Sequence, residues 1–498
     1  MNSPDTTRGA IPALGSPKAE HVLTAVALTL IASTLSFGYI VDVLIPLRPA
    51  VLLFTVVSIW ALTSQSVSQL SLLPRLSIFL YAVCFSATLG HLFSDDYVWW
   101  STPVASALIR NEQVSADMMT VGLVGLLGLL TGFRLHLGFS SKRHGKPRQP
   151  LSSLGPLAFL IMVCVAVALS WLVAPSATIL SQAYNTGGAA SAAAPMNFNA
   201  AYLLSYLVII LAYVDAEAEP STSRRRLKFF LIVAATAFIV GVLQILRGDR
   251  ESASLLAGLA LLYLTGSGPS MVASHVAFHW KRVRKIVVPA AALLVIFVAV
   301  GTVRASLSSA EGRARLSFLD ALATAAQENT WTSVLLTNLG QSGQFHQSGA
   351  EYLYGQTYLD YLLSLPPGFL TRPLGIERPL EAHRGPNWWF VNISAGGIHV
   401  VVVPFRNFGV TGAFVVLLCI GVFIASVETA NARRSLAARF LYGSVTVATF
   451  FWFWYGDMYI IRGLMAAAVL LPVYSGWLQM TRTWAAAPRG ASPVPEHG

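Results

Sequence analysis

Two arginines near the start of an apolar segment are the residues best suited to hold an anion. Arg247 and Arg250 stand three residues apart in QILRGDRESASLLAG, so they share a face if a helix begins there. Gly258 lies eleven residues after Arg247, close to three turns, and leaves room on that face for another backbone or an isoprenoid chain. Adjacent guanidinium groups repel each other unless an anion lies between them. We expect a bound diphosphate, or in the simpler alternative an ion cluster with Asp249 and Glu251.

A second candidate site lies in SAGGIHVVVVPFRNFGVTG, residues 394–412. Its apolar stretch is too short to cross a bilayer, and Pro404 interrupts it before Arg406 and Gly409. This pattern is typical of a re-entrant or broken helix that lines a cavity. His399 and Arg406 are about two turns apart and are expected to face that cavity together. Because imidazole titrates near neutrality, His399 is a candidate proton acceptor, and its alternative is a structural histidine bonded to a backbone carbonyl.

Further charged residues lie close to apolar segments. Asp457 and Arg462 stand in WYGDMYIIRG, where a salt bridge between them is the simpler interpretation and a ligand contact the other. Arg304 opens the longest polar stretch of the chain, and Asp42 lies near the outer end of the first apolar segment. Intramembrane or interfacial charges are costly, so each is a candidate functional residue.

The composition requires that most of these residues be positioned by helices in lipid. Of 498 residues, 55% are hydrophobic and only 11% are charged, against roughly 25% charged in soluble domains. The mean hydropathy is +0.63. The sequence predicts an all-α transmembrane bundle of about twelve spans. The spans centre near 24–44, 50–65, 75–92, 117–134, 154–174, 199–214, 229–246, 252–267, 286–303, 409–427, 440–456 and 463–480.

Basic clusters fall in alternate loops and predict the orientation. They occupy 142–148, 224–228, 281–285 and 433–439, so one orientation places all four in the cytoplasm together with both termini. The formal charge of +11 is then explained by the positive-inside rule rather than by nucleic-acid binding. The polar N-terminal stretch lacks a cleavage-like motif, so the first apolar run is read as a retained span. We predict a multi-pass protein of the inner membrane.

The predicted organisation has five parts. A cytoplasmic tail (1–23) precedes spans one to nine (24–303), a large periplasmic loop (304–408), spans ten to twelve (409–480) and a second cytoplasmic tail (481–498). A loop of that length is usually functional. Within it, Tyr354, Tyr358, Tyr361, Leu362 and Leu365 share one face of a predicted helix that Pro366–Pro367 ends. This helix lies either in the outer membrane interface or as a packed lid.

Several classes of site are absent from the sequence. The three cysteines, Cys84, Cys164 and Cys419, lie in apolar runs and have no disulfide or metal spacing. No Walker A, zincin or Rossmann motif is present, and we expect no cofactor and no metal. No cytoplasmic loop is long enough to bind a nucleotide-sugar in a soluble domain, so the substrate must bring its own energy. On the outer side every cation is an arginine, the residue suited to bidentate phosphate contacts.

Three segments resemble Wzy-type oligosaccharide repeat-unit polymerases. They are Arg247 to Gly258 with the following span, GQTYLDYLLSLPPGFL, and SAGGIHVVVVPFRNFGVTG, within residues 230–480. Many members of that family have an acidic residue shortly before NFG, whereas here Pro404, Phe405 and Arg406 stand in that place.

The resemblance implies a metal-independent membrane glycosyltransferase. It would transfer a growing glycan from polyprenyl diphosphate to the next lipid-linked repeat, in O-antigen, capsule or exopolysaccharide (lipopolysaccharide or polysaccharide) biosynthesis. Arg247, Arg250 and His399 would be catalytic, and the diphosphate would be bound by Arg247, Arg250, Arg304, Arg406 and Arg462. The implied partners are the polyprenyl-diphosphate-linked oligosaccharide, membrane lipid, and a chain-length regulator and flippase of the same pathway.

Three alternatives remain open at this point. An O-antigen ligase uses the same donor and differs only in its acceptor. A polysaccharide-lipid flippase or exporter fits the number of spans, although such proteins often carry charge at the midplane rather than at helix ends. A polyprenyl-phosphate-sugar transferase would use Asp42, but proteins of that kind have their large loop after the first span, where the loop here is very short.

Overall fold

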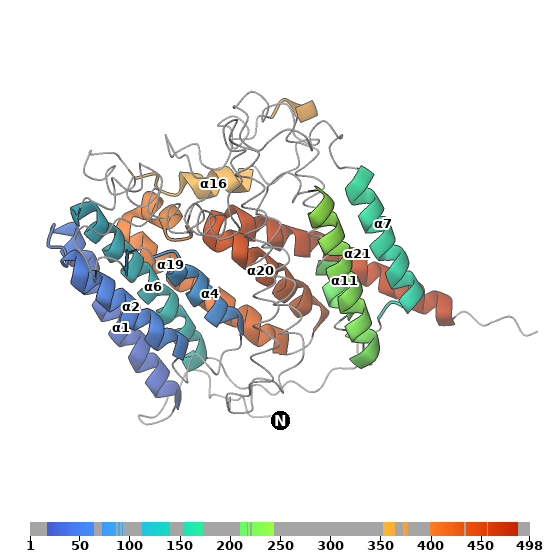
Figure 1. Ribbon diagram of the computed structural model, residues 1–498, viewed down its shortest axis with the longest axis horizontal. Helices are drawn as coiled ribbons and strands as arrows, with labels where there is room; N and C mark the ends of the chain where they lie inside the picture. The colour runs from blue at the N-terminus through green and yellow to red at the C-terminus, as the bar shows by residue number, and fades with distance from the viewer. Residues whose placement is uncertain are drawn as a thin grey trace, which may run out of the picture.

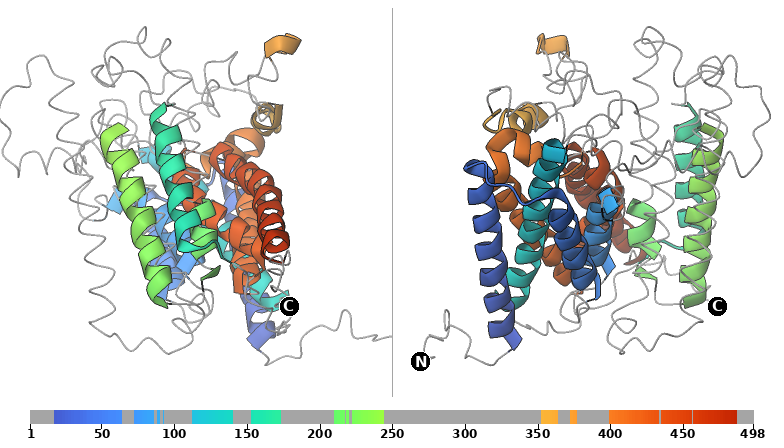
Figure 2. Two further views of the ribbon diagram at one scale, coloured as in Figure 1. Left: turned by 90° about the vertical axis from the view of Figure 1, so that its right-hand side faces the viewer. Right: turned by 60° about the vertical axis from the view of Figure 1, so that its left-hand side comes forward.

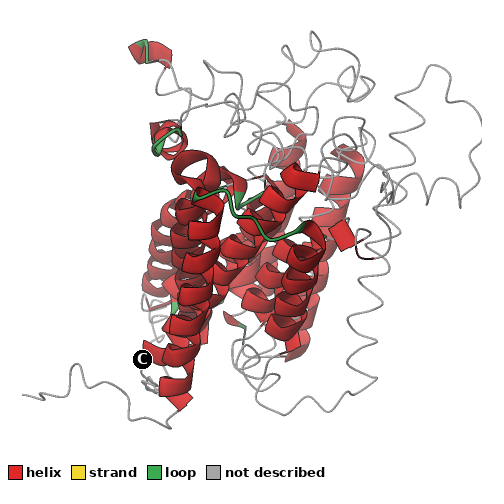
Figure 3. Cartoon of the chain, turned by 90° about the vertical axis from the view of Figure 1, so that its left-hand side faces the viewer, coloured by secondary structure: helices red, strands yellow, loops and turns green. Residues whose placement is uncertain are grey.

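The computed structural model of the chain is helical throughout the part that it describes. That part comprises residues 17–63, 72–85, 88–89, 92, 112–139, 153–172, 210–216, 218–219, 222–243, 352–363, 372–376, 399–432, 435–455 and 457–486. Figure 3 shows these residues as helices with a few short loops, without a strand among them. The predicted all-α class is therefore confirmed for the described residues.

Four of the helices contain segments long and apolar enough to cross a membrane. These segments are Lys18–Ile40 in α1 (Pro17–Ile40), Glu112–Phe139 in α6 (the same bounds), Val402–Asn431 in α19 (Val402–Ala432) and Tyr459–Met480 in α21 (Met458–Ala486). Two shorter apolar helices are α2 (Leu47–Thr63) and α4 (Leu72–Val83). The bundle also includes α7 (Pro156–Leu172), α11 (Thr222–Leu243) and α20 (Leu436–Tyr455). The described part of the fold therefore includes apolar helices long enough to cross a membrane.

Each of these helices overlaps a predicted span, with different ends. The first begins at Pro17, inside the predicted tail, and α4 ends at Val83, well before the predicted residue 92. The helix α19 begins at Val402 rather than 409, because the short apolar segment before the predicted span is helical as well. The predicted spans 252–267 and 286–303 lie outside the described residues.

The helix α6 lies at the centre of the bundle and is buried over nearly its whole length. Glycines on α6 let α19 approach closely. A Cβ atom at Gly128 would meet the Phe414 carbonyl oxygen, and one at Gly132 would meet that of Leu418. Small residues at such crossings are typical of helices that pack within a membrane, where close van der Waals contact replaces the hydrophobic effect.

Helix ends gather at two opposite ends of the bundle. At one end lies α16 (Gln356–Leu363), across the tops of α19 and its neighbours in Figures 1 and 2, and we call this the α16 end. There the ring of Tyr39, near the end of α1, packs on that of Phe405, near the start of α19 (6.1 Å between centroids). At the opposite end Arg134 of α6 contacts His21 of α1 (3.2 Å). The helices α6 and α19 therefore run in the same direction, and α1 runs against both.

Candidate functional site

The segment before α16 is fixed to the first turns of α19 by the main chain. The Leu353 amide donates to the Arg406 carbonyl (3.2 Å), and the Tyr354 amide donates to that of Asn407 (3.0 Å). These bonds use carbonyls at the end of the short helical segment that precedes Gly409. A loop segment and a helix start that are about fifty residues apart thereby form one rigid unit.

The Asn407 side chain completes this unit. It is fully buried, and its Oδ1 accepts a hydrogen bond from the Gly355 amide at 2.9 Å. Its Nδ2 donates to the Val403 carbonyl (2.8 Å) and to the Thr357 hydroxyl. Next to it Phe408 stacks on Tyr358 of α16, with centroids 6.2 Å apart. Both halves of the amide are used to hold α16 on α19.

The predicted interruption of the helix is present, but it lies at Gly409 rather than at Pro404. Gly409 has φ 71° and ψ −165°, a conformation that essentially only glycine adopts. Pro404 falls in the first turn of α19, where the missing N–H is not needed for an intrahelical bond. The break separates a short helical segment, 402–408, from the long helix that follows it.

His399 is enclosed by aromatic rings. It is 1% exposed, and its ring makes edge contacts with Tyr81 (4.7 Å) and Phe85 (5.7 Å). Its Nδ1 accepts a hydrogen bond from the Val401 amide at 3.2 Å. Burial lowers the pKa of His399 to about 3, and the nearby backbone of Tyr81 opposes that shift. The imidazole is neutral at pH 7, and its hydrogen bond is to a backbone amide rather than to the backbone carbonyl of the structural alternative, so the role of His399 stays a prediction.

Arg406 has surroundings different from those of His399. Its side chain is buried and lies close enough to Tyr352 for electrostatic interaction. Burial raises the pKa of Tyr352, and the positive charge of Arg406 opposes that effect. Tyr39 in turn lies close enough to Tyr352, Asp117 and Asp42 for electrostatic interaction. The α16 end thus holds an arginine, two tyrosines and two carboxylates in electrostatic contact.

Asp457, in the turn between α20 and α21, is a buried carboxylate at the same end. The Trp452 Nε1 donates a hydrogen bond to its Oδ1 at 2.6 Å. Tyr358 of α16 lies close enough for hydrogen bonding with Asp457 to influence the pKa of both groups. Burial raises the pKa of Asp457 to about 6, and the hydrogen bond from Trp452 and the nearby hydroxyl of Tyr358 oppose that rise. The partner found for Asp457 Oδ1 is Trp452, and the predicted partner Arg462 lies in α21 with its side chain outside the described part.

Arg247, Arg250 and Arg304 lie outside the described residues, so their predicted roles stay predictions. Among the side chains that the structure describes, no group of three or more His, Cys, Asp and Glu is arranged to hold a metal ion.

The helix α16 presents a face different from the predicted one. Its buried side chains are Thr357, Asp360 and Tyr361, whereas the predicted face included Tyr354 and Leu362, which are exposed. The outward side carries three leucines, each more than half exposed: Leu359, Leu362 and Leu363. The helix packs on α19, as the lid alternative expects, and its outward leucines agree with the membrane-interface alternative, because an exposed apolar face is stable against lipid. Both alternatives stay open.

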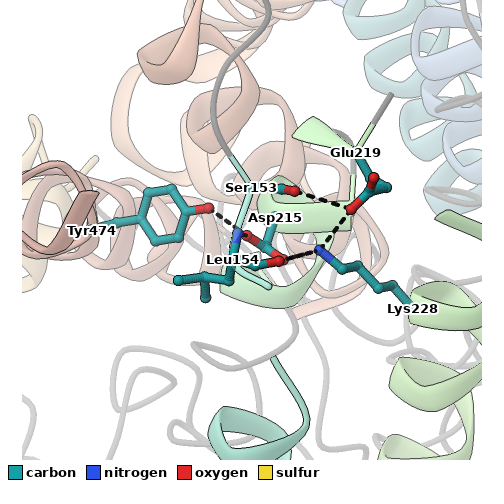
Figure 4. A network of polar contacts seen from close by, with 6 residues as sticks. All are labelled: Ser153, Leu154, Asp215, Glu219, Lys228 and Tyr474. Atoms are coloured by element: carbon teal, nitrogen blue, oxygen red, sulfur yellow. Dashed lines mark hydrogen bonds and ion pairs between the residues drawn. The ribbon is translucent and has the colours of Figure 1, made fainter. Parts of the chain in front are cut away.

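A buried ion network at the opposite end was missed by the sequence analysis. The sequence predicts Lys228 in a basic loop cluster, but the residue lies in α11 and is buried (Figure 4). Its Nζ contacts Asp215 Oδ2 at 2.7 Å and Glu219 Oε2 at 3.4 Å. Asp215 Oδ1 accepts hydrogen bonds from the Leu154 amide (2.7 Å) and the Tyr474 hydroxyl (2.8 Å). The signal available in the sequence was the run of acidic residues at 215–219 shortly before the basic cluster.

Comparison with protein-family models, with curated proteins and with solved structures finds no match to this chain.

Proposed function

We propose that this chain polymerises polyprenyl-diphosphate-linked oligosaccharide repeat units at the periplasmic face of the inner membrane. The observation that carries the proposal is the group of buried polar side chains at the α16 end of the bundle. Arg406, Asn407 and Asp457 all lie there, beside or beneath a helix whose outward leucines suit the membrane interface. Such a site is suited to a substrate with a lipid anchor and a charged headgroup.

The proposal includes an orientation of about twelve spans with both termini in the cytoplasm. The pairing of helix ends supports it. His136 of α6 bonds to Thr429 of α19 at 2.9 Å at the opposite end, where the basic clusters would place the cytoplasm. The ion network of Asp215 and Lys228 ties together segments that this orientation also assigns to the cytoplasmic side. The α16 end is then periplasmic.

In the proposed reaction the glycan bond to the diphosphate breaks, so negative charge develops on the leaving group. Preorganised guanidinium groups stabilise such charge without reorganisation during the reaction. Arg406 is buried at the α16 end and would take this role together with Arg247, Arg250, Arg304 and Arg462. Holding donor and acceptor lipids at one membrane face supplies further acceleration, because a bimolecular step becomes effectively unimolecular.

The test is a deletion strain of the producing organism, complemented with the intact gene. A polymerase predicts that single repeats accumulate on the final acceptor and that long glycan disappears. Loss of all surface glycan with polymer retained on the carrier lipid would instead indicate an O-antigen ligase. Unpolymerised repeats trapped on the cytoplasmic leaflet would indicate a flippase, and either result would overturn the proposal.

A further inference from the structure

The proposed reaction needs a group that takes the proton from the acceptor hydroxyl. The segment 394–412 contains no Asp or Glu that could take this role, and the residue just before Asn407 is Arg406. The neutral His399 is a weak base in its aromatic enclosure, with a pKa near 3. A proton acceptor must therefore be sought among the other buried groups of the α16 end.

Within the described residues, one oxygen of the Asp457 carboxylate has a hydrogen-bond partner and the other has none. Its Oδ1 is fixed by Trp452, and the side chain is 4% exposed. Its Oδ2 and the Tyr358 hydroxyl are both enclosed, and neither completes a hydrogen bond of good geometry within the described residues. Buried carboxylate oxygens are normally hydrogen-bonded, and an exception calls for a ligand or a role.

The surroundings of Asp457 connect it to the rest of the candidate site. The Val400 amide donates to the Phe453 carbonyl (3.2 Å), which fixes the last turns of α20 to the segment that holds His399. The ring of Trp452 packs on those of Phe423 and Phe453, with centroids 6.3 and 5.7 Å away. These rings fix Trp452, whose Nε1 holds the Asp457 carboxylate. A carboxylate held beside an aromatic side chain suits a sugar, because ligand sites combine aromatic side chains with a few placed polar groups.

We propose that Asp457 is the proton acceptor for the acceptor sugar, and that the Tyr358 hydroxyl occupies the position of the attacking hydroxyl while no acceptor is bound. This inference rests on the proposed function. The acceptor oxygen bonds to the anomeric carbon of the donor glycan as the bond from that carbon to the diphosphate breaks. The proton of the acceptor hydroxyl passes to Asp457 Oδ2 and then to water, and polyprenyl diphosphate leaves with the bonding electron pair.

The experiment measures elongation of lipid-linked repeats by purified full-length protein in proteoliposomes, with kcat and acceptor KM determined for four proteins. These are the wild type, Asp457→Asn, Tyr358→Phe and Glu112→Gln. The last is the matched control, because Glu112 is an exposed acid in the first turn of α6. Thermal melting of each protein reports whether it is folded.

Asp457→Asn is expected to lower kcat by about 100-fold or more, the usual contribution of a general base. Glu112→Gln is expected to stay within about threefold, because it leaves the candidate site unchanged. Tyr358→Phe is expected to lower kcat clearly less than Asp457→Asn does, because it alters the site without removing the base. Equal losses in Asp457→Asn and Tyr358→Phe would show that the pair only anchors α16 and would overturn the inference. A folded Asp457→Asn protein with nearly full kcat would overturn it as well.

A second variant covers the case in which Asp457→Asn does not fold. Asp457→Ala leaves a space beside Trp452, and added formate is expected to raise its kcat by about tenfold or more by replacing the missing carboxylate. No increase with formate would overturn the inference. A folded wild-type protein that does not elongate at all is a different result and contradicts the proposed function itself.

Discussion

The side-chain amide of Asn407 donates a hydrogen bond to the hydroxyl of Thr357, fifty residues earlier in the chain. Through this contact a short helix of the largest loop is fixed to the start of a membrane-length helix. Both residues are fully buried, so their polar atoms have no access to water as an alternative partner. The contact accounts for the position of Tyr358 above Asp457, and therefore for much of the candidate site.

The first prediction concerns Asn407. Asn407→Ala removes the partners of the Gly355 amide and the Thr357 hydroxyl, and leaving buried groups unpaired costs about 1–3 kcal/mol each. The variant should melt at a lower temperature in detergent and be cleaved faster by protease near 352–363. Asn431→Ala, in the last turn of the same helix, should change neither quantity. Wild-type cleavage rates in Asn407→Ala would contradict the proposed anchoring.

The second prediction concerns the break in α19. Gly409→Ala places a Cβ atom 3.1 Å from the Tyr352 ring and forces alanine into a conformation that glycine alone adopts readily. We expect a loss of about 1–3 kcal/mol in the free energy of unfolding.

Gly476→Ala is the matched control for Gly409→Ala. Gly476 lies inside α21, and a Cβ atom there meets nothing within 4 Å. Alanine should leave stability unchanged or raise it by up to about 1 kcal/mol, because it lowers the entropy of the unfolded chain. Similar melting of the two variants would show that the break is not required.

The third prediction is the pH dependence of stability that His399 confers. Its pKa is about 3 in the folded protein and 6.5 when exposed, so only the unfolded chain takes up this proton between those values. Its contribution is fully present above pH 6.5 and is lost as the pH falls towards 3, by about 1.4 kcal/mol per pH unit.

The measurement compares melting of the wild type and His399→Gln between pH 7 and 5. Asp457 and other groups titrate in both proteins, so the difference between the two curves isolates His399. The wild type should lose stability relative to the variant as the medium is acidified. Parallel curves would mean that the imidazole is not held neutral.

The fourth prediction is the pH dependence of the proposed reaction. Burial raises the pKa of Asp457 to about 6, and the groups facing it are Trp452 of α20 and Tyr358 of α16. The base form is present above pH 6, so kcat should fall about tenfold per pH unit below that value. A kcat that is constant from pH 7.5 to 5 would contradict this role.

The fifth prediction concerns the buried ion network at the opposite end. Lys228→Met leaves Asp215 and Glu219 buried without their cation, and breaking such a network costs about 3–5 kcal/mol. Arg224→Met removes an exposed cation from the same helix and should have little effect. Equal melting of the two variants would contradict the arrangement in Figure 4.

The helices of the bundle were predictable because lipid imposes a simple condition on the sequence. A segment that crosses a bilayer needs about twenty apolar residues, and the runs around α6 and α19 meet that condition in the sequence itself. Their ends were less predictable. The first turns of α19 contain Pro404 and Arg406, which read as a terminated segment, whereas proline is tolerated in a first turn.

The candidate site was only partly predictable, because its key contacts are not local. The spacing of His399 and Arg406 suggested two turns of one helix, but the helix begins at Val402, so that spacing does not place them on one face. The contacts of Asn407 with Thr357 and of Asp457 with Tyr358 join residues far apart in sequence. The periodicity of the sequence does not predict such pairs, because they form only when α16 packs over the end of the bundle.

The most direct measurement of the whole account is elongation by the purified protein in proteoliposomes that contain polyprenyl-diphosphate-linked repeats and no nucleotide-sugar. The account predicts a ladder of longer lipid-linked glycans and release of polyprenyl diphosphate, one for each repeat added. Folded protein that leaves the repeats as single units under conditions where donor and acceptor share one leaflet would contradict it.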